Sequence, residues 1–438
     1  MGTPRHRGSG KFRMTKRARC GIPFAVNAIP GPVVSGILAM TSGPARSIKE
    51  ISMLNKTRLL TPGPTQLPDR VRLAMARDML HHRKPEFKKL LHEVRENLQT
   101  LFGTEGTVIP LAASGSGAMT AAVANLFAAG ETVITIVGGK FGERWDNICA
   151  TLGVKTVTLE VPWGEGADVA AVEALLDANP AVSGILVQVS ETSTGAMHPV
   201  RKLAALARQR NVLLVADGVS AVSISPCPMD EWGIDCLLTG SQKGILLPPG
   251  LSFIALSPGA WAKAESIPCR DFYFNLVAER ESLAQDQTHF TPAINLLYGL
   301  RESLDMLLEN GLEAVYKKQW ALTCMARTGL TAMGFELLAK TRYTWGLTSF
   351  HLPTGITSGP LLAHIADKYG VVMAAGMGHL KDSSVRLGHM GWVDWSDVAA
   401  GLYALAASYR ALGGHIGMRD YLEQAMEAYE TALADGLP

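Results

Sequence analysis

Cysteines are few in this sequence, and none of them are close together. The six residues stand at Cys20, Cys149, Cys227, Cys236, Cys269 and Cys324, without a C-x-x-C pair. This dispersal argues against a metal knuckle and against a disulfide framework. We therefore expect a reducing, cytoplasmic location and no metal site. The sequence also lacks an uninterrupted apolar run of about 18 residues, so we expect no membrane-spanning helix.

Acidic residues are missing from the start of the chain. The first is Glu50, whereas residues 1–20 contain seven Lys or Arg. The whole chain of 438 residues has a net charge of only +2, which gives no reason to expect a nucleic-acid or membrane partner. We predict that residues 1–56 form a disordered basic extension. A transit peptide fits the same composition, as does a start assigned too early, with Met40 or Met53 as the true first residue.

From Thr107 onward, short aliphatic runs alternate with helical patterns. This alternation is typical of an α/β fold with a mostly parallel sheet covered by helices, whose ligands bind beyond the carboxyl ends of the strands. Helices are predicted near residues 117–129, 142–152, 167–178 and 199–210. Strands are predicted at Thr107–Ala112, Thr132–Val137, Val154–Val161, Gly184–Val189, Val212–Asp217, Cys236–Thr239 and Ser252–Leu256.

Beyond about residue 300 the pattern changes to that of a smaller α+β domain. We predict a large domain at residues 57–300 and a small C-terminal domain at residues 301–438. Its helices are expected near residues 293–332, 359–368, 394–412 and 418–434. Its strands are expected at Phe335–Leu338, Gly346–Leu352, Val371–Ala374 and Val385–Leu387.

Two strand ends carry the residues with the clearest chemical meaning. Asp217 ends one apolar strand, and Lys243 follows the next in a polar, glycine-containing turn. Considered one at a time, Asp217 could be an ordinary capping or turn aspartate, and Lys243 could be an ordinary solvated loop lysine. Together they have the arrangement that pyridoxal phosphate chemistry requires, in which a lysine bonds the cofactor covalently and an acid keeps the pyridine nitrogen protonated.

Three other turns could contact such a cofactor. The small residues from Ser114 to Met119 open a helix, where backbone N–H groups favour a phosphate. Phe141 follows a strand and could stack on a flat ring, although core filling is an ordinary alternative. The turn at residues 191–195 supplies three hydroxyls that could bond the cofactor or only solvent.

In this order, the pieces resemble the class V aminotransferases among the fold-type-I pyridoxal phosphate enzymes. The likeness is greatest to the alanine/serine–glyoxylate (or pyruvate) and archaeal aspartate branch, and it runs from about Leu59 to Leu412. Six motifs carry it: Leu60-Thr61-Pro62-Gly63-Pro64-Thr65, His82-Arg83, Phe141-Gly142-Glu143-Arg144, Glu191-Thr192-Ser193-Thr194-Gly195, Gly240-Ser241-Gln242-Lys243 and Arg386-Leu387-Gly388-His389-Met390-Gly391.

The resemblance implies a role for each matching residue around pyridoxal 5'-phosphate. Lys243 and Asp217 would bind the cofactor covalently and at its pyridine nitrogen. Arg386 would grip the substrate carboxylate, a task that suits its planar fork of donors, with Gly63 beside the substrate. The remaining cofactor contacts would come from Ser116, Gly117, Ala118 and Gln242 near the phosphate, Phe141 and Val219 on the two ring faces, and Thr192 near the ring oxygen.

Two of these implied contacts depart from the usual family pattern. Ala118 stands where relatives carry histidine, so that particular contact would be absent. Thr288 and Thr291 match residues that reach the phosphate of the neighbouring subunit, although relatives often have tyrosine at the Thr288 position. The resemblance therefore implies a homodimer with shared active sites.

The activity implied is transamination between a small 2-amino acid, alanine or serine, and a 2-oxo acid such as glyoxylate or pyruvate. Aspartate remains an alternative donor. A lyase or desulfurase would be expected to carry a cysteine in a glycine-rich loop, but Cys324 stands in a helical pattern. A non-catalytic structural subunit is the other alternative, and the retained Lys243, Asp217 and Arg386 argue against it.

Overall fold

The computed structural model describes residues 55–268 and 270–438. The predicted extension at residues 1–56 therefore lies outside the described residues, apart from its last two. The helices are α1 (Asp69–Met75), α2 (Pro85–Phe102), α3 (Gly115–Leu126), α4 (Glu143–Thr151), α5 (Val169–Ala178), α6 (Val200–Gln209), α7 (Met229–Trp232), α8 (Pro258–Ser266), α9 (Leu276–Leu283), α10 (Ile294–Leu308), α11 (Gly311–Ala332), α12 (Ser358–Tyr369), α13 (Trp395–Ala411) and α14 (Tyr421–Asp435), with a 3-10 turn η1 (Gly378–Leu380). The strands are β1 (Arg58–Leu59), β2 (Val108–Leu111), β3 (Thr132–Val137), β4 (Lys155–Glu160), β5 (Val182–Gln188), β6 (Ser190–Glu191), β7 (Ala196–Met197), β8 (Leu213–Asp217), β9 (Cys236–Gly240), β10 (Ser252–Leu256), β11 (Leu347–His351), β12 (Val371–Val372), β13 (Ala374–Ala375) and β14 (Ser384–Gly388).

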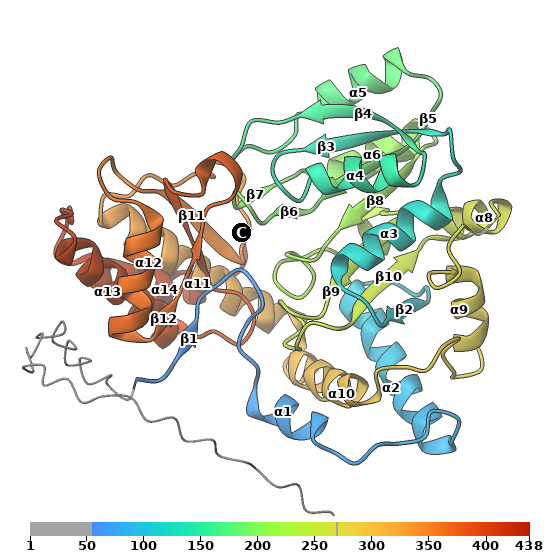
Figure 1. Ribbon diagram of the computed structural model, residues 1–438, viewed down its shortest axis with the longest axis horizontal. Coiled ribbons are helices and arrows are strands. Elements are labelled where there is room, and N and C mark those ends of the chain that lie inside the picture. Colours follow the sequence, from blue (N-terminus) through green and yellow to red (C-terminus); the bar gives the residue numbers. More distant parts are fainter. Residues whose placement is uncertain (1–54, 269) are drawn as a thin grey trace, which may run out of the picture. The chain divides into compact units, whose positions relative to one another are not determined.

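A seven-stranded sheet forms the centre of the larger part of the fold, in the order β2-β10-β9-β8-β5-β3-β4 (Figure 1). Strand β10 runs antiparallel to both of its neighbours, and the other neighbouring pairs are parallel. The predicted α/β fold with a mostly parallel sheet is confirmed. All seven predicted strands of this part are present, each within two residues of the expected bounds.

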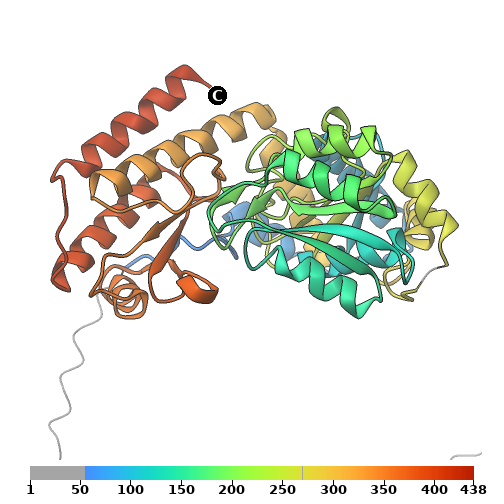
Figure 2. The ribbon, with the colours of Figure 1, turned by 90° about the horizontal axis from the view of Figure 1, so that it is seen from above.

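Helices cover both faces of this sheet, which explains why its inner strands are almost continuously apolar, whereas the edge strand β4 is partly exposed. Helices α5 and α6 lie on one face and α4 on the other (Figure 2). The four helices predicted between the first five strands correspond to α3, α4, α5 and α6. At the start of α5, the Asp168 side chain accepts a hydrogen bond from the backbone N–H of Ala170, which satisfies one free donor of the first turn.

A second apolar core lies among α11, α12, α13, α14 and an antiparallel sheet of order β11-β14-β13. Leu60, from the N-terminal side of the described chain, is buried in this second core, because β1 pairs in parallel with β12. Leu304 and Leu307 of α10 still belong to the first core. The division into domains at residues 300 and 301 stays a prediction.

Two strand predictions in this part need correction. The predicted strand Phe335–Leu338 is reduced to a single bridge between Leu337 and Phe350. The predicted strand Val371–Ala374 is interrupted at Met373, because β12 pairs with β1 whereas β13 pairs with β14. Across the two described stretches of chain, the structure has no helix long and apolar enough to cross a membrane.

Candidate active site

A cavity of about 400 Å³ opens beyond the carboxyl ends of β5, β8 and β9. This size is typical of a site for a small molecule. It lies where ligands of parallel sheets ordinarily bind, because the strand ends leave backbone groups and turns free to contact them. Nine of the predicted site residues line this cavity: Gly63, Ser116, Phe141, Thr192, Asp217, Val219, Gln242, Lys243 and Arg386.

Lys243 lies in the turn that follows β9, and its side chain points into the cavity. Its amine Nζ donates a 2.6 Å hydrogen bond to Ser220 Oγ and a 3.1 Å bond to Thr192 Oγ1. Gly63 lies against the lysine chain, because a Cβ at this position would be 3.0 Å from Lys243 Cγ and Cε. A side chain at position 63 would press against the lysine, and the φ of +104° at Gly63 also disfavours any residue other than glycine.

The pKa of Lys243 is lowered to about 8, chiefly by burial. Asp217 and Glu191 raise this pKa, whereas Arg386 and Arg144 lower it further. Because a free lysine in water titrates near pH 10.4, the buried amine has a far larger neutral fraction at physiological pH. A neutral amine is nucleophilic, which is what bonding to an aldehyde requires.

Asp217 ends β8, and this buried residue lines the cavity. Burial raises the pKa of its carboxyl to about 6, and the backbone N–H of Val219 opposes that change. This N–H donates to Asp217 Oδ1 at 2.8 Å. A buried carboxylate with a single backbone donor can accept a further hydrogen bond, and a protonated pyridine nitrogen would supply one.

Phe141 lies over the cavity in the loop after β3, and two buried polar residues fix this loop. The Phe141 backbone N–H donates to Glu191 Oε2 at 3.2 Å, and its carbonyl accepts a bond from Gln188 Nε2 at 2.8 Å. Glu191 is fully buried, and it also accepts bonds from the backbone N–H groups of Gly142 and Ser193. The loop backbone that carries Phe141 is thereby held in place, independently of any ligand.

The beginning of α3 forms another wall of the cavity. Ser116 Oγ accepts a 2.9 Å bond from Arg144 Nη1, so a guanidinium lies beside the helix N-terminus. Gln242 Oε1 is buried there without a hydrogen-bond partner in the described chain. A positive charge, a helix N-terminus and an unsatisfied amide together suit an anionic ligand group.

Arg386, in the middle of β14, lines the cavity from the side of the second core. Its Nε donates to the carbonyl of Ala375 at 2.9 Å and its Nη1 to the carbonyl of Thr192 at 3.2 Å. Burial lowers the pKa of this guanidinium. It remains charged at neutral pH because its ordinary pKa is above 12.

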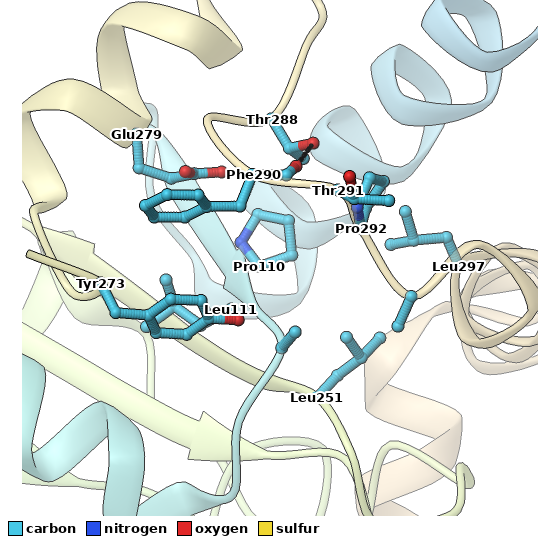
Figure 3. A pocket seen from close by; sticks show the side chains of 12 residues that line it. Pro110, Leu111, Leu251, Tyr273, Glu279, Thr288, Phe290, Thr291, Pro292 and Leu297 are labelled. Carbon is cyan, nitrogen blue, oxygen red and sulfur yellow. Dashed lines mark hydrogen bonds between the residues drawn. The ribbon is translucent and has the colours of Figure 1, made fainter. Parts of the chain in front are cut away.

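Four predicted cofactor contacts lie elsewhere within the described chain. Gly117 and Ala118 belong to α3 but are not among the residues that line the cavity, and Ala118 is fully buried. Thr288 and Thr291 line a separate cavity between α9 and α10, where Thr288 Oγ1 donates to the carbonyl of Phe290 at 2.6 Å (Figure 3). Their predicted contacts with a cofactor phosphate stay predictions.

Comparison with known proteins identifies the family. The sequence profile described as aminotransferase class-V matches residues 59–393. The chain belongs to the class V aminotransferases. Among its relatives is the serine–glyoxylate aminotransferase of Methylorubrum extorquens, which is 34% identical over 77% of this chain and 87% of the relative.

Two further relatives show how varied the descriptions in this family are. One is described as the small subunit of a soluble hydrogenase from Synechococcus; it is 32% identical over 82% of this chain and 95% of the relative. The other is a solved structure, the subgroup IV aspartate aminotransferase of Thermus thermophilus. It is 32% identical and has a TM-score of 0.76, with 81% of this chain and 99% of that one covered.

Family membership makes this aminotransferase a pyridoxal phosphate enzyme of fold type I. The residues present fit the cofactor. The cavity holds a lysine with a lowered pKa, a buried carboxylate and a cationic wall at a helix N-terminus. Gln242 Oε1 and Ser190 Oγ are buried there without partners in the described chain, and a bound ligand could satisfy them.

Among the residues that line the aminotransferase site, Ser220, Arg144 and Met377 were not assigned a role from the sequence. Arg144 belongs to the motif Phe141-Gly142-Glu143-Arg144 and comes three residues after Phe141. This spacing could have indicated that Arg144 lies at the same site. Ser220 comes three positions after Asp217 in the same turn. Met377 lies in a short irregular stretch after β13, where the sequence has no signal that relates it to a site.

Proposed function

We propose that this aminotransferase transfers the amino group of a small neutral 2-amino acid, alanine or serine, to a 2-oxo acid such as glyoxylate or pyruvate. The observation that carries the proposal is the presence of Lys243, Asp217 and Arg386 in one cavity. These residues supply a covalent anchor, a partner for the pyridine nitrogen and a cation for a carboxylate.

The choice of a small neutral donor follows from the charges around the cavity. Its lining contains two guanidinium groups in the described chain, and that of Arg144 is bonded to Ser116 at the start of α3. This leaves Arg386 for the carboxylate that every 2-amino acid carries. The neighbouring wall includes Ala374 and Met377, apolar side chains that offer no partner to a second carboxylate.

Pyridoxal phosphate, when bound, withdraws electrons from the substrate Cα, and the chain's own residues direct this effect. Phe141 and Val219 would hold the two faces of the ring, and Asp217 would keep the pyridine nitrogen protonated. Lys243 Nζ would take the proton from the substrate Cα as a base and give it up again as an acid. Arg386 fixes the substrate carboxylate throughout, so Cα stays within reach of the amine.

The anionic end of the cofactor would lie at the start of α3. Ser116, Gln242 and Arg144 would hold the phosphate there, with the predicted Gly117 and Ala118 in the same helical turn. Arg144 is important because a doubly charged phosphate needs a counter-charge, which hydroxyl and amide dipoles only partly supply.

Aspartate is the alternative donor, and two observations favour it. Arg144 is a second cation within the same cavity, and a relative of known structure is described as an aspartate aminotransferase. If Arg144 binds a side-chain carboxylate instead of the phosphate, aspartate would be the preferred donor.

A panel of donors separates the two proposals. The steady-state rate of the purified enzyme should be measured with alanine, serine and aspartate as donors and with glyoxylate or 2-oxoglutarate as acceptor. Pyruvate should be tested as acceptor with serine and aspartate only, because alanine and pyruvate exchange without net reaction. We expect alanine or serine to react with a kcat/KM at least about tenfold higher than that of aspartate. A preference for aspartate that disappears in Arg144→Gln would establish the alternative.

We also propose a homodimer in which Thr288 and Thr291 contribute to the partner's phosphate site. Both line a cavity apart from the chain's own Lys243 site (Figure 3). Beside them, Phe272 is 83% exposed and its ring packs 5.5 Å from that of Phe290. A large exposed aromatic side chain next to an apolar cavity is typical of a surface that another chain covers.

The proposed cytoplasmic location is supported by the cysteines. Cys149, Cys227 and Cys236 are free thiols that are buried in the core. Burial raises the pKa of Cys149 and Cys227 to about 12, so these thiols stay protonated and unreactive. Such cysteines act as small apolar residues, which suits a reducing compartment.

A further inference from the structure

Ser220 lies at the centre of a buried network of hydrogen bonds. It accepts the shorter of the two bonds from Lys243 Nζ, at 2.6 Å, and its hydroxyl is also bonded to that of Thr192. The three residues are between 2% and 5% exposed. Because a hydroxyl both donates and accepts, Ser220 can bond the lysine amine in its charged form and in its neutral form.

The position of Ser220 is fixed by the two strands on either side of it. The turn after β8 is tied to β9 by a 2.7 Å bond from the Gly218 N–H to the Leu238 carbonyl. It closes on itself with a 2.9 Å bond from the Ala221 N–H to the Gly218 carbonyl. The same turn packs against the lysine turn, because a Cβ at Gly244 would be 2.5 Å from Ser223 Oγ. The hydroxyl of Ser220 is therefore held in place relative to Lys243.

The bonds of Ser220 differ from those of an ordinary turn serine. Three residues later, Ser223 Oγ donates to the neighbouring carbonyl of Val222 at 2.7 Å, a local bond that serves the turn itself. Ser220 instead bonds side chains from two distant turns, those that carry Thr192 and Lys243. Its contacts therefore serve the amine and not the local backbone.

We infer that Ser220 is a positioning residue, which holds the amine of Lys243 during the part of each turnover when this amine is not bonded to the cofactor. The inference rests on the proposed function, because only an amine that is released and bonded again needs such a partner. Thr192 shares the contact, but its hydroxyl is also expected to reach the ring oxygen. Ser220 has no such expected contact with the cofactor and bonds only Lys243 and Thr192 among the described side chains.

The charged groups around the amine determine how the loss of Ser220 should change the pKa of Lys243. Asp217 from β8 and Glu191 from β6 favour the ammonium form, whereas Arg386 from β14, Arg144 from α4 and burial disfavour it. A hydroxyl bonds a charged ammonium more strongly than a neutral amine. Ser220 therefore offsets part of the effect of burial, and its removal should lower the pKa of Lys243 below about 8.

The test uses the enzyme loaded with pyridoxamine 5'-phosphate, in which Lys243 is not bonded to the cofactor. Acetic anhydride is added at a series of pH values, and acetylation of the Lys243 peptide is measured by mass spectrometry. The variants are Ser220→Ala, Ser220→Thr and the control Ser225→Ala. Ser225 is equally buried on the same segment, and its hydroxyl has no partner in the described chain.

In the unaltered enzyme the rate of acetylation should rise with an inflection below the ordinary pKa of lysine, because burial lowers the pKa of Lys243. Ser220→Ala should lower the inflection by about one pH unit. The hydrogen bond from Lys243 to Ser220 should favour the ammonium over the neutral amine by about tenfold. Ser220→Thr, which keeps the hydroxyl, should restore it, and Ser225→Ala should leave it unchanged. An inflection in Ser220→Ala equal to that of the unaltered enzyme, or an equal shift in Ser225→Ala, overturns the inference.

A second readout separates positioning from binding. Ser220→Ala should lower the single-turnover rate constant about tenfold while the half-saturating substrate concentration stays the same. A rise in half-saturation alone would also overturn the inference. The acetylation result does not depend on which donor the enzyme uses, so a failure of the proposed donor preference would be recognised separately.

Discussion

Replacement of Arg386 by lysine tests the proposed substrate contact. The guanidinium is held by the carbonyls of Ala375 and Thr192, at 2.9 and 3.2 Å, which orients its plane within β14. Lysine has a single ammonium and cannot bond both carbonyls and both oxygens of a carboxylate. We therefore expect the loss of at least one charge-assisted hydrogen bond, about 1.5–3 kcal/mol, or about ten- to a hundredfold in binding.

The two half-reactions should be measured separately by single-turnover absorbance, with alanine as donor and with pyruvate or glyoxylate as acceptor. Because both kinds of substrate carry the carboxylate, the half-saturating concentrations of both should rise by similar factors. Arg327→Lys is the matched control. Its guanidinium is also partly buried, and it donates to the carbonyl of Ala339 and lies 3.5 Å from the ring centre of Tyr343, outside the cavity. Unaltered half-saturation in Arg386→Lys, with full cofactor content, would place the carboxylate elsewhere.

Three further predictions concern the cofactor site. Asp217→Asn should still bind the cofactor but remove the Cα proton about a hundredfold more slowly, or slower still. An unchanged single-turnover rate would mean that the Asp217 carboxylate has only a structural role. Arg144→Gln should weaken pyridoxal phosphate about tenfold in equilibrium dialysis but leave pyridoxal, which lacks the phosphate, unaffected; equal weakening of both would refute a phosphate contact. Lys243→Ala chains mixed with chains disabled at Thr291 should regain activity. In each heterodimer, one site combines the intact Lys243 of one chain with the intact Thr291 of the other. If no activity returned although the subunits had been shown to exchange, shared sites would be excluded.

The sequence predicted most of the central sheet and the middle of the site for the same reason. Strands buried on both faces are continuously apolar, so Val182–Gln188 and its neighbours are distinct from the helices between them. Asp217 and Lys243 follow such strands directly, and the carboxyl ends of neighbouring parallel strands meet at one edge of the sheet. Their proximity is therefore predictable from the sequence alone.

The parts that were not predicted depend on contacts between distant segments. The two-residue strand Arg58–Leu59 exists because it pairs with Val371–Val372, and so short a strand has no periodicity of its own. The same pairing divides the predicted strand Val371–Ala374. Ser220 was missed because its role depends on the distance to Lys243, and a lone serine in a turn carries no signal of such a contact.

The central claim is that Lys243 binds the cofactor covalently. The most direct measurement is borohydride reduction of the purified enzyme loaded with pyridoxal phosphate, followed by peptide mass spectrometry. We predict that the reduced cofactor is attached to the peptide that contains Lys243 and to no other, and that Lys243→Ala retains neither the attachment nor turnover. Attachment to a different lysine, or full transaminase activity in Lys243→Ala without an added amine, would contradict the account.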